Sequence, residues 1–226
     1  MSIGLVPRPT AVTLGDGAFA VTDAVSITGE TDAVVLLSAR LHRRTGLSPA
    51  TTPDARIRLR IDGEGAAESY RLRIDADAVE LTASDAAGLQ HGVHTLLQLL
   101  APTRRGWVWP AVVIDDAPRF AHRGLMLDVA RHFFAVDVVE RLLDRMAELK
   151  LNVLHLHLSD DQGWRLALDS RPRLAEHASD SAALGDAGGC YSRADWQRIL
   201  DAAASRHITV IPEFDVPGHT HAVGLA

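Results

Sequence analysis

The hydrophobic and polar positions of residues 1–117 follow the periods of a small mixed domain. A short strand is predicted over residues 25–28, followed by a helix that Asp32 could cap and that runs to about Arg44, before Gly46. Strict alternation then predicts three strands, and Ser84 with Asp85 opens a second helix. These later elements are marked by Ile57, Leu59 and Ile61; Tyr70, Leu72 and Ile74; Val79 and Leu81; and Leu89, Val93, Leu96, Leu97 and Leu100.

A different pattern begins at Asp116, where the segment DDAPRFAHRG is typical of a linker. Strand, helix, strand, helix and strand then follow in order. Strands are predicted over 125–129, 152–158 and 208–214, and helices over 136–150 and after a cap at Ser192. Alternation of strands with helices indicates parallel pairing and right-handed crossovers. We therefore predict an α+β domain over 1–117 and an α/β domain over 118–226.

One face of the predicted parallel strands is polar near the carboxyl ends. Successive side chains on a strand point to opposite faces, and the alternate positions are mostly apolar, as a layer of helices requires. A barrel interior is filled mostly by branched apolar residues, and catalytic groups of such barrels lie at the carboxyl ends of the strands. We therefore predict a functional site, with a mutually satisfied buried network as the alternative. The polar set is Asp128, His155, His157, Glu213 and Asp215.

The loops after these strands add further polar groups. Residues 159–164 (SDDQGW) begin a long glycine-containing segment that extends to Tyr191, and residues 217–221 (PGHTH) follow the third strand. Loops of that length in compact domains are usually functional or disordered. Arg131 follows the first strand, whereas Arg123 precedes it. Strand direction therefore selects Arg131 over Arg123 as the arginine that faces a ligand.

Composition narrows the class of function. The net charge of −6 and the absence of a dense Lys/Arg run argue against nucleic acid as a partner. The single cysteine, Cys190, is interpreted as a bystander, and no metal or cofactor is expected. No signal-peptide pattern or membrane-length apolar run is visible, so we expect a cytoplasmic chain with no membrane partner. A leader outside these residues would be compatible with export.

Four motifs follow one another along the chain: the VPRP opening, LDVARHFF, HLHLSDDQGWR and PEFDVPGHTH. Together they resemble glycoside hydrolase family 20, the β-N-acetylhexosaminidases. The resemblance implies a small α+β N-terminal domain followed by the first three βα units of a truncated TIM (β/α)8 barrel, since a whole barrel needs about 250 residues. It implies hydrolysis of terminal β-linked N-acetylglucosamine or N-acetylgalactosamine, with an N-acetylhexosamine-containing oligosaccharide as the partner. The implied mechanism is substrate-assisted and retaining.

The resemblance also assigns roles to residues. Arg131 corresponds to the arginine that anchors hydroxyls at the non-reducing side of the sugar, and Asp215 to a carboxylate at the same barrel mouth. Asp160 and His219 correspond to residues that support the acidic glutamate. The family's catalytic Asp-Glu pair belongs after the fourth barrel strand, downstream of Ala226. We therefore expect negligible turnover from the 226-residue chain.

Three other interpretations stay open at this point. A metal-dependent hydrolase could use His155, His157, Asp215, His219 and His221, since histidine and carboxylate are metal ligands. A non-catalytic N-acetylhexosamine-binding module could retain Arg131. The favoured interpretation is a fragment or split protein. Three parallel strands with two helices leave an open strand edge, through which we expect association, whereas the N-terminal domain could fold alone.

Overall fold

The computed structural model describes residues 3–226 of the chain. It divides into two compact units, Met1–Ala121 and His122–Ala226, and each unit has its own hydrophobic core. Among the described residues, no helix is both long enough and apolar enough to cross a lipid bilayer.

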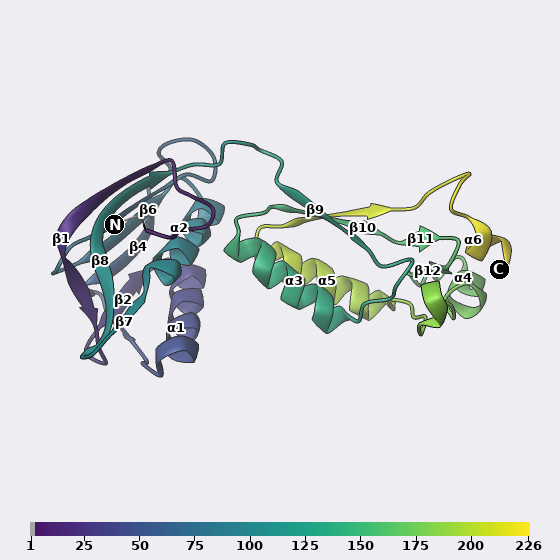
Figure 1. Cartoon of the computed structure of the whole chain (residues 1–226), viewed down its shortest axis with the longest axis horizontal. Helices are drawn as coiled ribbons and strands as arrows, with labels where there is room; N and C mark the ends of the chain where they lie inside the picture. The colour runs from purple at the N-terminus through teal and green to yellow at the C-terminus, as the bar shows by residue number, and fades with distance from the viewer. Residues whose placement is uncertain (1–2) are drawn as a thin grey trace. The chain divides into compact units, whose positions relative to one another are not determined.

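The first unit is a mixed β-sheet with two helices on one of its faces (Figure 1). The strand order is β1-β8-β5-β6-β4-β2-β3, and β7 pairs with β8. β2, β4 and β6 pair in parallel, whereas β5, β8 and β1 pair antiparallel. The strands are β1 (Ala11–Val21), β2 (Ser26–Gly29), β3 (Ala50–Thr51), β4 (Ile57–Ile61), β5 (Tyr70–Ile74), β6 (Val79–Ala83), β7 (Ala101–Thr103) and β8 (Gly106–Asp116).

The two helices α1 (Thr31–Thr45) and α2 (Ala86–Leu99) were both expected, but only one is capped as predicted. Asp85 accepts a hydrogen bond from the amide of Gly88 and so caps α2. Asp32 does not cap α1, because the helix begins one residue before it. Its carboxylate instead lies in the first turn, where negative charge favours the helix dipole. Gly46 ends α1 in the left-handed conformation (φ 79°), which glycine adopts without strain.

β1 is absent from the predicted elements and is one of the two longest strands of the sheet. Its sequence, AVTLGDGAFAV, is exposed over most of its length and carries two glycines. Its pairing with β8 is interrupted between Leu14 and Ala18, where the register shifts. An exposed edge strand with a bulge has no continuous apolar alternation, so periodicity does not reveal it.

The second unit is a three-stranded parallel sheet in the order β13-β10-β9. The predicted succession of strands and helices is confirmed. The strands are β9 (Gly124–Asp128), β10 (Val153–His157) and β13 (Thr209–Glu213), with the short pair β11 (Ser159–Asp160) and β12 (Gly163–Trp164). The helices are α3 (Val136–Glu148), α4 (Pro172–His177), α5 (Arg193–Ala204) and α6 (His221–Gly224), with one 3-10 turn at Ala183–Gly185.

The helices α3 and α5 lie side by side against one face of this sheet (Figure 1). The apolar positions of β10, Leu154 and Leu156, are fully buried and pack with Val139 and Leu143 of α3 and Ile199 of α5. Ser192 caps α5 through a reciprocal capping box with Asp195. The helix layer therefore covers the apolar face, and the other face keeps the polar residues of the strands.

Candidate functional site

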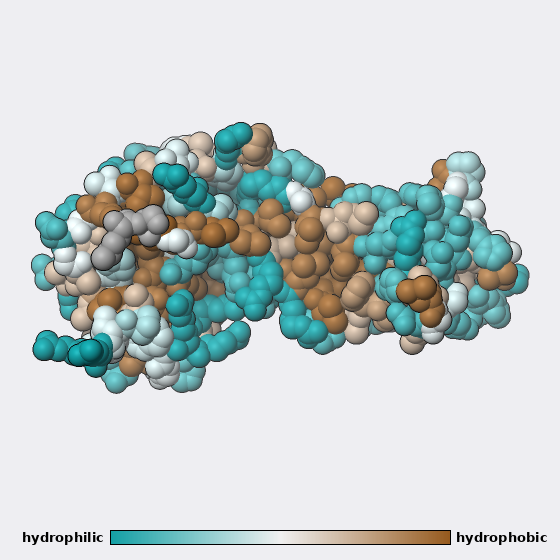
Figure 2. Space-filling view, in the orientation of Figure 1, coloured by the Kyte–Doolittle hydropathy of each residue, from teal (hydrophilic) through white to brown (hydrophobic). Residues whose placement is uncertain are grey.

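The carboxyl ends of the three parallel strands bring the predicted polar residues together. Strand register places His157 of β10 directly between Asp128 of β9 and Glu213 of β13. In Figure 2, hydrophobic residues gather on the visible face over α3 and α5, whereas hydrophilic residues predominate toward the loops that carry α4 and α6. The strand ends therefore lie in the hydrophilic part of this unit.

His157 is the buried centre of the cluster, with a side chain only 5% exposed. Its Nδ1 contacts a carboxylate oxygen of Glu213, and its Nε2 lies 2.8 Å from Oδ2 of Asp160. Burial acts to lower the pKa of His157, but the hydrogen bonds to Asp160 and Glu213 and the charge of Asp128 outweigh it and raise the pKa above its ordinary value. An imidazolium satisfies this geometry, because both ring nitrogens then donate.

Asp160 receives four donors although its side chain is only 2% exposed. They are Nε2 of His157 at 2.8 Å, Nδ1 of His219 at 3.1 Å, the guanidinium of Arg131 at 2.7 Å and the amide of Asp161 at 2.7 Å. Burial acts to raise the pKa of Asp160, but these donors outweigh it and hold the pKa below its ordinary value. The side chains that donate to this buried carboxylate therefore come from the ends of three strands, β9, β10 and β13, or from the segments that follow them.

Arg131 joins the same network from the turn after β9. Oδ1 of Asp128 accepts the amides of Ala130 and Arg131, an Asx-type turn that folds the chain back over the strand end. The guanidinium then pairs with Asp128 at 2.5 Å and with Asp160 at 2.7 Å. Because 41% of its side chain stays exposed, Arg131 keeps surface that a ligand can meet.

His219 and Asp215 complete the predicted set from the segment after β13. His219 reaches Asp160 and is 47% exposed, while Oδ2 of Asp215 lies 4.0 Å from its Nε2. The amide of Asp215 donates to the hydroxyl of Ser159, which ties this segment to β11. Arg131, Asp160 and His219 thus form one connected network, with Asp215 at its margin. Their functional roles stay predictions.

Two features of the site were not singled out from the sequence. The rings of Trp164 and Phe214 stack, with their centroids 4.8 Å apart and an interplanar angle of 24°. Both residues belong to the sequence motifs HLHLSDDQGWR and PEFDVPGHTH. Arg165 is fully buried, which no periodicity indicates because buried arginine is rare. Arg123, by contrast, lies at the opposite end of β9 as expected and donates to the carbonyl of Lys150.

A metal site is the main chemical alternative for this cluster. His157, Glu213 and Asp215 offer ligand atoms within 4.8 Å of one another. A metal-bound histidine needs a deprotonated ring nitrogen. Both ring nitrogens of His157 instead face carboxylates, and its pKa is raised by those hydrogen bonds in spite of burial. The arrangement therefore fits a protonated histidine between carboxylates better than a metal centre.

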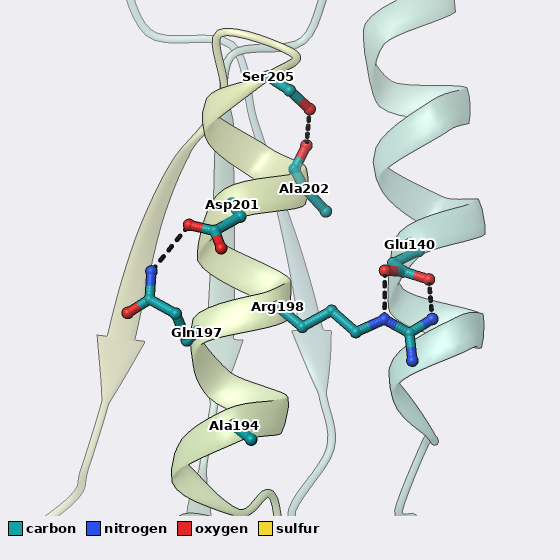
Figure 3. Close-up of a pocket in the computed structure, with 7 residues that line it drawn as sticks. All are labelled: Glu140, Ala194, Gln197, Arg198, Asp201, Ala202 and Ser205. Atoms are coloured by element: carbon teal, nitrogen blue, oxygen red, sulfur yellow. Dashed lines mark hydrogen bonds and ion pairs between the residues drawn. The ribbon is translucent and has the colours of Figure 1, made fainter.

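A separate surface groove of about 580 Å³ runs between α3 and α5 (Figure 3). It lies on the side of the helices away from the strands, and a bidentate ion pair between Arg198 and Glu140, at 2.5 and 2.7 Å, crosses it. These side chains satisfy each other and tie the two helices together.

Parallel strands that alternate with helices and carry a polar network at their carboxyl ends are the arrangement found in β/α barrels. Residues 120–226 match the model of the glycosyl hydrolase family 20 catalytic domain, and residues 2–117 match domain 2 of the same family. The chain belongs to glycosyl hydrolase family 20. The predicted fold class, a small α+β domain followed by the first three units of a TIM barrel, is confirmed.

Individual relatives agree with this assignment. A β-N-acetylhexosaminidase of Cellulomonas fimi is 40% identical over 98% of this chain and 48% of the relative. The N,N'-diacetylchitobiase of Vibrio harveyi is 32% identical over 98% of this chain and 28% of the relative. The solved Streptomyces plicatus N-acetyl-β-hexosaminidase in complex with Thio-NAglucal is 43% identical, with a TM-score of 0.92 over 97% of this chain and 47% of that chain. The chain spans less than half the length of each of these proteins.

We predict that the second unit is most stable in mildly acidic solution. The raised pKa of His157 means that its stabilisation is full below the ordinary imidazole pKa of about 6.5 and is lost as the pH rises through the folded value. The lowered pKa values of Asp160 and Glu213 mean that their stabilisation is present above their ordinary values of about 4 and is lost as the pH falls through the folded values.

Hydrogen exchange of β10 amides as a function of pH, corrected for intrinsic rates, measures this stability. The His157→Gln variant is the matched control and should lose the decline above neutral pH. If the stability of the wild-type unit did not change between pH 4 and pH 9, the assignment of a charged His157 between the carboxylates of Asp160 and Glu213 would be contradicted.

Proposed function

We propose that this chain supplies the sugar-anchoring part of a β-N-acetylhexosaminidase, an enzyme that removes terminal β-linked N-acetylglucosamine or N-acetylgalactosamine. The observation that carries the proposal is the network in which Arg131, Asp160 and His219 meet at the carboxyl ends of β9, β10 and β13. Family membership supports it, and so do solved relatives, among them the Vibrio harveyi exo-β-N-acetylglucosaminidase in complex with N-acetylglucosamine.

In this proposal, Arg131 holds hydroxyl groups of the sugar. Its guanidinium is fixed on one side by Asp128 and Asp160 and is exposed on the other. A guanidinium stays charged and offers directional donors, so a fixed one can orient a hydroxylated ring. The ion pairs also mean that little side-chain freedom is lost on binding.

Asp160 and His219 have a supporting electrostatic role in this proposal. The 3.1 Å contact between them places a partly exposed imidazole on a buried, ionised carboxylate. The contact with Asp160 fixes the orientation of the imidazole. In the substrate-assisted mechanism implied by the family resemblance, the acetamido oxygen of the sugar attacks the anomeric carbon and a glutamate protonates the leaving oxygen. His219, held in place by Asp160 at the barrel mouth, would then support that glutamate by a hydrogen bond.

The 226-residue chain by itself is predicted to hydrolyse a chromogenic β-N-acetylglucosaminide no faster than buffer. The family resemblance places the orienting aspartate and the acidic glutamate outside these residues, and general acid catalysis alone contributes about 10²–10⁴-fold. The measurement is release of the chromophore by purified chain whose folding is checked by circular dichroism. Reproducible turnover that Arg131→Ala abolishes would mean that another carboxylate of this chain is the acid.

Binding of N-acetylglucosamine to the same folded chain tests the anchoring role itself. Perturbation of the amide resonances of Arg131, Asp161 and His219 by millimolar N-acetylglucosamine would support the proposal. Perturbation without turnover would also fit the second candidate function, a non-catalytic N-acetylhexosamine-binding module. Saturation with N-acetylglucosamine that leaves these three resonances unmoved would contradict the proposed anchoring site.

A further inference from the structure

Arg165 is a buried arginine whose guanidinium binds main-chain carbonyl oxygens of three separate segments. It is 0% exposed and lies directly after β12. Its nitrogens donate five hydrogen bonds, which join the turn after β9 to two parts of the long segment before α5. The acceptors are the carbonyls of Val129 at 3.0 Å, Ala130 at 2.6 Å, Ser179 at 2.9 Å, Ser181 at 2.7 Å and Gly189 at 3.1 Å.

The surroundings of Arg165 are shaped for a guanidinium. A side chain at Gly163 would overlap the guanidinium group, and one at Gly189 would overlap the ring of Phe133 that lies beneath it. Burial of a positive charge is costly, and burial holds the pKa of Arg165 below its ordinary value. Five carbonyl dipoles offset that cost. The planar guanidinium of arginine, with its five N–H donors, can reach all five carbonyls.

These hydrogen bonds converge on the main chain of Arg131. Val129 and Ala130 are the two residues that precede Arg131, and Arg165 holds both of their carbonyls. On the other side, the amide of Ala183 donates to the carbonyl of Arg131 at 2.7 Å. Ala183 belongs to the same segment that Arg165 fixes through the carbonyls of Ser179 and Ser181. The backbone of Arg131 is therefore held before and after the residue.

We propose that Arg165 is a positioning residue for Arg131: it locks the turn after β9 to the segment of residues 179–189, and thereby fixes the guanidinium of Arg131 where a sugar would bind. The link to sugar binding rests on the proposed function of Arg131, whereas the link to backbone order does not. A displacement of about 1 Å in a functional group can cost much of a site's function. Loss of the Arg165 contacts should therefore weaken sugar binding by a measurable amount.

The competing explanation is that Arg165 only stabilises the unit as a whole. The two explanations differ in where the molecule loosens. A positioning role predicts faster hydrogen exchange at the amides of Ala183 and Gly189, with little change in α5. A general structural role predicts the same change throughout the unit.

The test uses hydrogen exchange and N-acetylglucosamine affinity on the full chain, with Arg165→Met as the first variant. Arg165→Lys is the milder second variant, because an ammonium keeps the charge but cannot reach all three segments. Arg206→Met is the matched control. Arg206 lies in the same unit and donates to the carbonyl of Ala202 and to Asp144, away from the predicted site.

We expect exchange at Ala183 and Gly189 to become about tenfold faster in the Arg165 variants, with the Lys variant the weaker, while α5 stays protected. Affinity for N-acetylglucosamine should fall about tenfold in Arg165→Met, and this loss should disappear when Arg131 is already alanine. Arg206→Met should leave exchange at Ala183 and Gly189 unchanged. Unchanged exchange at Ala183 in both Arg165 variants, or equally faster exchange throughout the unit, would overturn the proposal.

The two readouts separate this inference from the proposed function. Local loosening at Ala183 in a chain that shows no affinity for N-acetylglucosamine would support the positioning of Arg131 and count against its role in sugar binding. An affinity loss that persists undiminished in the Arg131→Ala background would show that Arg165 acts by another route, and would overturn the inference while leaving the proposed function intact.

Discussion

Replacing Asp160 with alanine is expected to lower the free energy of unfolding of the His122–Ala226 unit by about 3–5 kcal/mol, the range for breaking a buried ion pair from one side. Asp160 is 2% exposed and accepts hydrogen bonds from His157, His219 and the amide of Asp161 while it pairs with Arg131. Its removal leaves the imidazolium of His157 buried next to a cavity, with Glu213 as its remaining partner on the other ring nitrogen.

Hydrogen exchange of the β10 amides against denaturant concentration measures this change in the second unit alone. Asp169→Ala is the matched control, because Asp169 is 82% exposed and pairs with Arg193 on the surface. Surface ion pairs contribute little, so this control should change the free energy of unfolding by less than about 1 kcal/mol. Equal effects of the two substitutions would show that the network around Asp160 does not hold the strand ends together.

The sequence predicted the polar face of the parallel strands because alternation is a strong local signal. Once His155 and His157 alternate with Leu154 and Leu156, the two histidines must share the face opposite the helices. Parallel pairing then brings Glu213 to the same edge, and the structure shows both histidines in contact with it. The position of these groups therefore follows from the period of two and the direction of the strands.

The partners of each polar group could not be predicted in the same way. Asp160 lies beyond the end of β10, on the two-residue strand β11, where no periodicity fixes the direction of a side chain. Its contacts depend on the turn that Asp128 shapes and on the path of the segment after β13. The partners of Arg165 are even harder to predict from the sequence. All five of its acceptors are main-chain carbonyls, which every residue type carries.

Replacing Arg131 with alanine is expected to weaken binding of N-acetylglucosamine by about tenfold to hundredfold, because hydrogen bonds to a charged group contribute about 1.5–3 kcal/mol. Asp128 and Asp160 hold its guanidinium at 2.5 and 2.7 Å, so the donors are already oriented before a sugar arrives. The measurement is titration of the folded chain with N-acetylglucosamine, followed by amide resonances near β9.

Arg123→Ala is the matched control for this prediction. Arg123 lies at the opposite end of β9 and donates to the carbonyl of Lys150, so its loss should leave the affinity within about twofold, as expected for independent sites. Derivatives of the sugar methylated at the hydroxyls farthest from the anomeric carbon sharpen the test. They should bind the wild-type chain more weakly but bind Arg131→Ala no worse than N-acetylglucosamine does. Equal discrimination by both proteins would mean that another group reads those hydroxyls, and that Arg131 serves only to hold Asp128 and Asp160 in place.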